Sequence, residues 1–419
     1  MNAVSPVQPG MQRKTDWGSV AQLAFCGLAF LGFLSLAGVM GLSGITNQVN
    51  QGSSANIPSA FSLALSYLLI AGLLILSTGS AFLRILGGRQ PAWLERAMQA
   101  VDRPLFWLIL LWPLVLLVGA WAANIPTISW LLLPPLHLLA VGLPIIWLVH
   151  LGRRGLPTGS LQRFLGVLSA GMAGSFFLAF VFELLAIIVL LVIGLIILVG
   201  SPSALLQLNF LAQRLMNSNM DPEVVMRALQ PYLQNPVVIF GGLAFISGFV
   251  PLIEEFFKPL AVWLLGKKLL TPAEGFAAGI LAGGGFALTE SLGQVATSSG
   301  SEWLLVELGR GGTDLLHILT AGMMGWALVS AWRDGKAWRL GLTYLGAILL
   351  HGFWNALTLG IGLAPFLSFS PSSLPYYQTL GIIAPAGLGV LFVAMLLILL
   401  RVNHILRAGG TERKQNADY

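Results

Sequence analysis

Charged residues are scarce in this chain. Its 419 residues include only 22 Lys and Arg and 16 Asp and Glu, or 9% charged, whereas 56% of the residues are hydrophobic. A soluble globular protein carries about 25% charged residues, because its surface has to be covered in water. The scarcity excludes a soluble enzyme, a disordered chain and a nucleic-acid-binding protein. It predicts a polytopic membrane protein surrounded by the lipid bilayer.

Cysteine is scarcer still, since Cys26 is the only one and lies in an apolar run. A single cysteine excludes an intrachain disulfide framework and a CxxC metal or redox motif. The chain also lacks a Gly-x-Ser-x-Gly motif and a Ser/His/Asp pattern, so nucleophilic serine or cysteine catalysis is disfavoured.

Long apolar runs, in contrast, fill most of the chain. A helix needs about 20 apolar residues to cross a hydrocarbon core of about 30 Å, and this criterion predicts an all-α bundle of about ten transmembrane helices. We expect these spans near 19–44, 58–83, 105–123, 129–149, 164–200, 237–265, 273–297, 313–332, 340–363 and 377–400. The run at 164–200 exceeds one untilted crossing, so we expect it to tilt, break or extend beyond the membrane.

The distribution of basic residues predicts the orientation. With both termini in the cytoplasm, 18 of the 22 basic residues fall in cytoplasmic segments. The opposite side then holds only Arg214, Arg227 and Arg310, while Lys258 lies inside a span. This asymmetry is typical of the positive-inside rule, and it predicts a multi-pass membrane protein with both termini in the cytoplasm.

Four regions follow from the spans and their charges. Residues 1–163 form an accessory membrane region of four spans, and residues 164–236 hold the long span and an extracytoplasmic segment. That segment contains two short amphipathic helices, at 205–216 and 222–233. Residues 237–363 form a catalytic membrane core of four spans, and residues 364–419 hold the last span and a basic cytoplasmic tail.

The sixth span carries an unusual group of charges. Glu254, Glu255 and Lys258 lie between Pro251 and Pro259, and the spacing allows Lys258 to pair with either glutamate. A charged residue inside the bilayer costs about 2.5–3.5 kcal/mol even on the lenient insertion scale, so such residues are candidates for function. One Glu–Lys pair between helices would leave the second carboxylate without an explanation.

Further polar residues occur in the spans around it. Glu290 follows three glycines in the seventh span, His317 lies in the eighth, and His351 and Asn355 share one face of the ninth. Asp314 is interpreted as an acid at the start of the eighth helix. Helix depth places the glutamates and histidines between the middle and the outer third of the membrane, where they can converge on one cavity.

Two histidines and three glutamates around water fit hydrolysis. A carboxylate can accept a proton from water, and neutral imidazoles together with a carboxylate can bind zinc or another divalent metal. An asparagine amide can stabilise an oxyanion as a peptide carbonyl is attacked. An alternative is a proton- or cation-coupled transporter, for which charged residues within spans are also typical, and another is a non-catalytic membrane scaffold.

The ordered motifs resemble those of the PrsW intramembrane proteases, within the larger group of CAAX-prenyl-endopeptidase and bacteriocin-processing (CPBP) membrane proteases. They are Glu254-Glu255-Phe-Phe-Lys258, Phe286-x-x-x-Glu290, His317 and His351-x-x-x-Asn355, over about residues 237–360. The larger group has an arginine where Pro259 stands and a histidine at Glu290. These departures match the PrsW branch.

The resemblance implies an intramembrane endopeptidase of glutamic or metallo type. Its substrate would be a membrane-anchored regulator, such as an anti-sigma factor. Glu254 or Glu255 would be the general base, and His351 with Asn355 would form the oxyanion side. Glu290 and His317 would complete the water or metal site, with Glu255, Glu290, His317 and His351 as possible metal ligands. Lys258 would control the protonation of its glutamate neighbours, and Phe286 would support the site; no other cofactor is expected.

Overall fold

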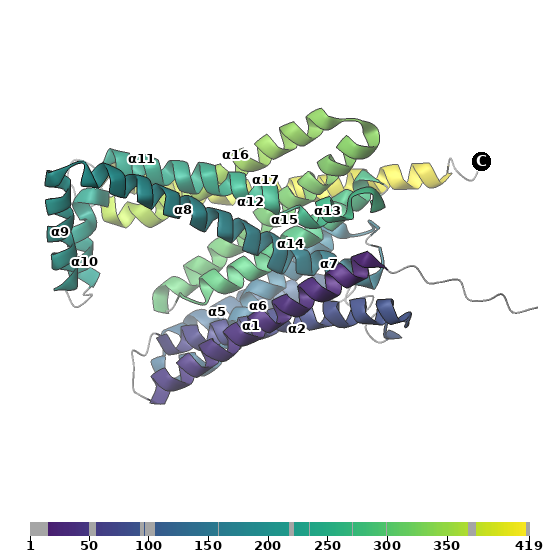
Figure 1. Ribbon diagram of the computed structural model, residues 1–419, viewed down its shortest axis with the longest axis horizontal. Helices are drawn as coiled ribbons and strands as arrows, with labels where there is room; N and C mark the ends of the chain where they lie inside the picture. Colours follow the sequence, from purple (N-terminus) through teal and green to yellow (C-terminus); the bar gives the residue numbers. More distant parts are fainter. Residues whose placement is uncertain are drawn as a thin grey trace, which may run out of the picture.

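The computed structural model is built of helices, and no strand occurs in the part of the chain that it describes (Figure 1). The structure describes residues 16–49, 56–92, 96, 105–157, 159–217, 222–233, 235–269, 271–298, 300–367 and 374–415. Within these ranges, nine helices are long and apolar enough to cross a membrane. The predicted all-α, polytopic fold is therefore confirmed.

Nine of the ten predicted spans correspond to these long helices. The predicted span at 105–123 differs, because its apolar helix Ile109–Ala123 is shorter than the others. It consists of α4 (Leu105–Leu108), a 3-10 turn (Ile109–Leu111) and α5 (Trp112–Ala123). Pro113 lies at the start of α5. At this position the missing backbone N–H of proline costs the helix no hydrogen bond.

The N-terminal helices pack directly on the remainder of the protein. They are α1 (Trp17–Val49), α2 (Asn56–Leu86) and α6 (Pro126–Arg153). Ile70 and Leu74 of α2 and Val141 and Ile145 of α6 belong to the same buried core as the central helices. This core holds α6 against α14 (Pro272–Val295) and α15 (Trp303–Asp334).

The long fifth run remains one continuous helix whose α-helical pattern is interrupted by a π-helical turn. It comprises α7 (Leu161–Ser169), a π-helical turn η2 (Ala170–Ser175) and α8 (Phe176–Val199). Two short helices follow, α9 (Pro202–Met216) and α10 (Pro222–Leu233), which confirms the helices predicted at 205–216 and 222–233. In Figure 1 they stand across the far end of α8.

The sixth span is broken twice. α11 (Pro236–Ala244) leads into a π-helical turn η3 (Phe245–Phe249), which is followed by α12 (Val250–Phe257) and α13 (Leu260–Leu265). The breaks occur where prolines remove a backbone donor from the helix. Helices α14 (Pro272–Val295), α15 (Trp303–Asp334), α16 (Ala337–Leu367) and α17 (Leu374–Gln415) complete the fold.

Helices α14 and α15 form the buried centre of the bundle. Their backbones touch because a side chain at Gly275, Gly279 or Gly283 of α14 would collide with the α15 carbonyls of Gly325, Ala321 and His317. Small residues at four-residue spacing permit such close approach in membrane helices. The contact at Gly283 sets the position of His317 relative to α14.

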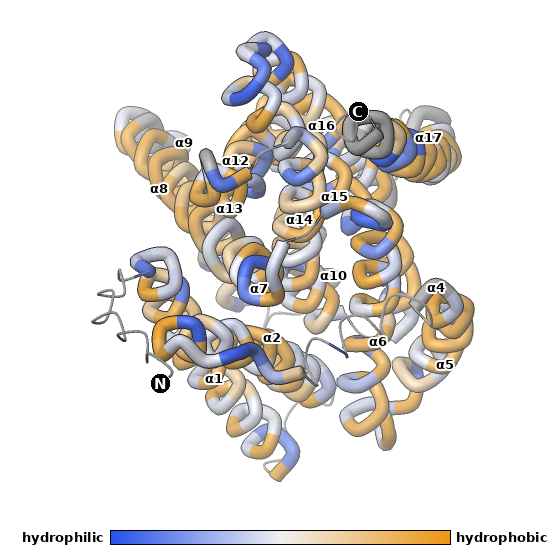
Figure 2. The backbone as a smooth tube through the Cα atoms, turned by 90° about the vertical axis from the view of Figure 1, so that its right-hand side faces the viewer, coloured by the Kyte–Doolittle hydropathy of each residue, from blue (hydrophilic) through white to orange (hydrophobic). Residues whose placement is uncertain are grey.

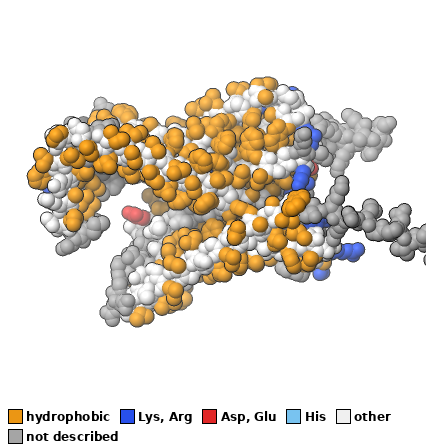
Figure 3. Space-filling view, viewed as in Figure 1, with side chains coloured by type: hydrophobic (Ala, Val, Ile, Leu, Met, Phe, Trp, Pro, Cys, Tyr) orange, Lys and Arg blue, Asp and Glu red, His pale blue; other side chains and the backbone are white. Residues whose placement is uncertain are grey.

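The surface is largely apolar, as expected for a protein in lipid. In Figure 3 the lysine and arginine side chains gather at one end of the molecule, the right-hand end of the view. The hydropathy-coloured tube shows apolar segments along most of the helices, with hydrophilic stretches mainly at helix ends (Figure 2).

Candidate active site

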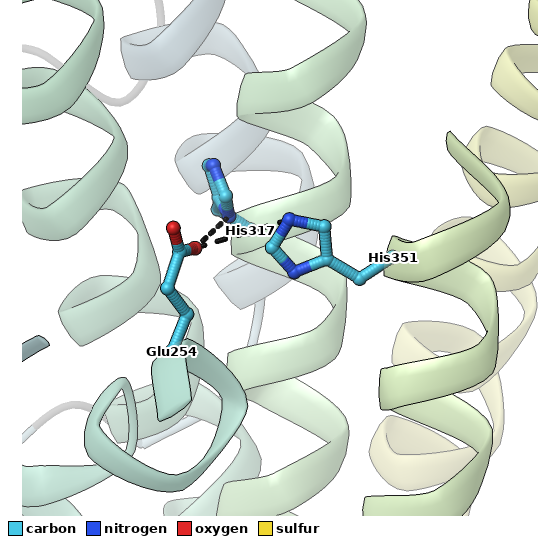
Figure 4. A group of neighbouring side chains, drawn as sticks. All are labelled: Glu254, His317 and His351. Atoms are coloured by element: carbon cyan, nitrogen blue, oxygen red, sulfur yellow. Dashed lines mark ion pairs between the residues drawn. The ribbon is translucent and has the colours of Figure 1, made fainter. Parts of the chain in front are cut away.

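Three helices bring Glu254, His317 and His351 together (Figure 4). Glu254 comes from α12, His317 from α15 and His351 from α16, and all three are buried. Oε2 of Glu254 lies 3.9 Å from Nδ1 of His317 and 3.9 Å from Nε2 of His351. These three donor atoms all lie within 4.8 Å of one another.

Besides Glu254, each imidazole lies close to a second carboxylate, on its other ring nitrogen. Nδ1 of His351 lies at hydrogen-bond distance, 2.8 Å, from Oε1 of Glu255, and Nε2 of His317 lies 2.7 Å from Oε2 of Glu290. Because an ionised carboxylate only accepts hydrogen bonds, the ring nitrogen beside it carries the proton. The other nitrogen of each ring then presents a lone pair towards Glu254.

Lys258 lies at the centre of the acidic residues. Its Nζ atom is 2.6 Å from Oε1 of Glu255 and 3.1 Å from Oε2 of Glu254, and it lies 5.2 Å from the centre of the Phe286 ring. The side chain is fully buried. One ammonium group therefore compensates two adjacent carboxylates, as the sequence spacing predicts.

A cavity of about 720 Å³ adjoins this group. Glu254, Glu290 and His351 line it, as do Phe286 and Asn355. Pockets of about 300–1,000 Å³ are typical of ligand sites. The polar residues predicted from the sequence thus share one cavity wall or lie directly behind it.

Phe286 packs against the His317 ring. It is buried, and its ring lies 5.2 Å from that of His317 in an edge-on arrangement. A second edge-on contact, at 5.8 Å, joins it to Phe176 of α8. The contact with Phe286 restricts the orientation of the His317 ring.

Asn355 lines the cavity, but its amide is already used by the backbone. Nδ2 donates to the carbonyl of Ile246 in η3 at 2.9 Å, and Tyr344 donates its hydroxyl to the Leu252 carbonyl at 2.7 Å. Helix α16 thus supplies hydrogen bonds to the irregular part of the sixth span, where backbone carbonyls need partners. An amide nitrogen carries two N–H groups, and one of them remains for a ligand.

Arg310 and Asp314 adjoin the site, which the sequence pattern did not indicate. Arg310 was expected on the extracytoplasmic side and Asp314 at a helix start, whereas α15 begins at Trp303 and both residues are buried within it. Nη2 of Arg310 lies 3.0 Å from Oε2 of Glu290, and Nε donates to Ser291, whose hydroxyl donates to Asp314. Residues 307–314 have low hydropathy, so the apolar pattern did not indicate that the helix begins before them. The helical spacing of Glu307, Arg310 and Asp314, at i, i+3 and i+7, was the signal that could have shown it.

The site residues fit a divalent metal. Oε2 of Glu254 and Nδ1 of His317 are buried, and neither makes a hydrogen bond within the described residues. Carboxylate oxygen and imidazole nitrogen are ligands that zinc accepts, and histidine ligands in metal sites usually have a carboxylate on their other nitrogen. The chemistry of the donor set and the second carboxylates agree with such a site.

The structure differs in one respect from the ligand set predicted from the sequence. That set named Glu255, Glu290, His317 and His351, whereas the group that faces one point consists of Glu254, His317 and His351. Adjacent helical residues point in different directions, and Glu255 is turned towards Lys258 and the far side of His351. Glu255 and Glu290 lie behind the two histidines.

Comparison with known proteins agrees with this arrangement. No curated protein and no solved structure matches the chain. Residues 186–398 match the family described as "PrsW family intramembrane metalloprotease", and the matched segment contains all the site residues named above. Because this match covers half of the chain, the buried Glu/His/His group lies within a membrane-embedded hydrolase of polypeptides, and the chain belongs to the PrsW family of intramembrane proteases.

Proposed function

We propose that this protein hydrolyses peptide bonds of membrane-anchored regulators, such as an anti-sigma factor, with water activated at Glu254. The observation that carries the proposal is the Oε2 atom of Glu254, which makes no hydrogen bond within the described residues although Nζ of Lys258 lies 3.1 Å away. It faces the lone-pair nitrogens of His317 and His351 at 3.9 Å each, at the wall of a 720 Å³ cavity. A buried oxygen that makes no hydrogen bond is costly, and a water molecule or a metal ligated there offsets this cost.

In this proposal Glu254, His317 and His351 hold a divalent metal, with zinc as the first candidate. The metal, when bound, lowers the pKa of its water to about 7 and polarises a carbonyl. Glu255 and Glu290 hold the two imidazoles in the orientation that the ligand set requires. Lys258 places one positive charge against both of the paired glutamates.

The substrate carbonyl would lie on the Asn355 side of the cavity. The free amide N–H of Asn355 borders this space, and a donor placed there stabilises negative charge on a carbonyl oxygen. The resemblance assigns Asn355 and His351 to the oxyanion side, but in this proposal both nitrogens of His351 are used by Glu255 and the metal, so Asn355 alone supplies the donor.

The cellular setting is part of the same proposal. Both termini lie in the cytoplasm of a bacterium, and the protein spans its cytoplasmic membrane. The gathering of basic side chains at one end of the molecule supports this orientation. Residues 1–163 serve as the accessory region and residues 237–363 as the catalytic core, flanked by 164–236 and 364–419.

Metal content of the purified protein tests the proposed site. We expect about one equivalent of a divalent metal by mass spectrometry, and its loss in His317→Ala and His351→Ala. His404→Ala is the matched control, because His404 is exposed on α17 far along the chain from these ligands. Full metal content in both ligand variants, or cleavage that is insensitive to chelators, would contradict the metal-assisted form of the proposal.

A further inference from the structure

The cavity wall contains one acidic residue that the proposed chemistry does not use. Glu183 lies on α8 and lines the same cavity as Glu254 and Glu290. Together with Phe176, Ala179 and Phe180 it forms one face of the helix, at the i, i+3, i+4 and i+7 positions. The residue is therefore directed to the cavity, although most of α8 is exposed to lipid.

Glu183 also differs from the other acids of the site in its charge balance. Glu254, Glu255 and Glu290 each have a basic side chain within 3.1 Å, namely Lys258 or Arg310. Glu183 has no such partner within the described residues, and its Oε1 atom is buried without a hydrogen bond there. A carboxylate in a membrane normally pairs with a basic group or faces a water-filled space.

Helix α8 holds this carboxylate in a defined place. Phe176 packs edge-on against Phe286 at 5.8 Å, and Phe182 packs against Phe257 of α12 at 5.0 Å. These contacts join α8 to the two helices that carry Glu290 and Glu254. The position of Glu183 in the cavity wall is thus tied to the position of the hydrolytic group.

We infer that Glu183 binds a lysine or arginine side chain of the substrate, close to the scissile bond. The inference rests on the proposed function, because a substrate segment that reaches Glu254 occupies the cavity that Glu183 lines. A cavity of 720 Å³ holds only a short stretch of polypeptide, so the recognised residue lies within a few positions of the bond that is cut. The preferred substrate is a membrane-anchored protein with a basic residue at this point.

Binding of defined peptides tests this inference without relying on hydrolysis. The probe is a series of synthetic single-span peptides that carry one Lys, Gln or Glu at successive positions, titrated against the Glu254→Gln protein in detergent micelles. We expect Lys at one or two positions to improve binding at least tenfold over Gln. Adding Glu183→Gln should abolish this preference, and adding Glu183→Lys should transfer it to the Glu peptide.

The controls separate the possible outcomes. Glu302→Gln, which removes an exposed acid at the start of α15, should leave the Lys preference in place. The inference is overturned if the preference for Lys survives Glu183→Gln, or if no position shows a preference. Thermal unfolding confirms that each variant is folded. Failure of the wild-type protein to cleave any peptide would contradict the proposed function alone, since the binding comparison does not depend on cleavage.

Discussion

Oε2 of Glu290 lies 2.7 Å from Nε2 of His317 and 3.0 Å from Nη2 of Arg310. The contact with His317 links α14 to α15. It determines which nitrogen of His317 faces Glu254. The consequences of this geometry can be measured.

Replacing Glu290 with Gln should weaken the site without unfolding the protein. The neutral amide cannot hold the protonated nitrogen of His317 as the carboxylate does, and loss of such an outer partner typically costs 10–100-fold in metal affinity or activity. We expect a loss of this size in metal affinity, measured by competition with a chelator of known affinity. An unchanged affinity in a folded Glu290→Gln protein would show that the contact does not orient His317.

Arg310 should act through Glu290. Arg310→Gln removes the guanidinium that positions the carboxylate, so we expect about a tenfold loss of activity, with partial recovery in Arg310→Lys because one charged donor is restored. The double variant with Glu290→Gln should lose little beyond Glu290→Gln alone. Arg214→Gln, on exposed α9, is the control. Independent, additive losses would instead indicate that Arg310 contacts substrate or has only a structural role.

The Glu255–Lys258 pair should show strong coupling in stability. Removing one partner of a buried ion pair costs about 3–5 kcal/mol, and Lys258→Met should cost more than Glu255→Gln because the lysine compensates two carboxylates. The double variant should be less destabilised than the sum of the single changes. Thermal unfolding in detergent measures these differences, and simple additivity would contradict the assigned pairing.

Gly283 should tolerate no side chain. Gly283→Val would force α14 away from the His317 carbonyl, so we expect loss of both activity and thermal stability. Gly341→Ala is the matched control, since a side chain there meets open space and the residue is exposed on α16. Equal tolerance of both substitutions would show that the α14–α15 contact is looser than described.

The sequence predicted much of this fold and site because charge is so rare in the chain. Apolar length alone located nine long helices, and the cost of buried charge singled out Glu254, Glu255, Lys258 and Glu290. His137 of α6, a histidine outside the motifs, lies at hydrogen-bond distance from Glu307 and from the Leu292 carbonyl, 3.1 Å in each case, so it joins α6 to α14 and α15. The local sequence pattern is sufficient to predict long apolar helices and charged residues inside them.

Other features depend on contacts between distant segments. Helical spacing could not decide which of Glu254 and Glu255 faces both histidines. This depends on the break at Pro259 and on the position of α16. Arg310 was expected on the extracytoplasmic side and Asp314 at a helix start, because their contacts with Glu290 and Ser291 lie on α14, across the helix interface. The cavity face of Glu183 likewise follows from the packing of α8 on α12 and α14.

Cleavage by the Glu254→Gln protein tests the central claim most directly. The wild-type protein and this variant are reconstituted in proteoliposomes with a panel of single-span substrates, and the products are identified by mass spectrometry. Because the substitution removes the carboxylate that faces both imidazoles, we predict cleavage by the wild type and a loss of at least a thousandfold in the folded variant. Cleavage by Glu254→Gln at a rate within tenfold of the wild type would contradict the account.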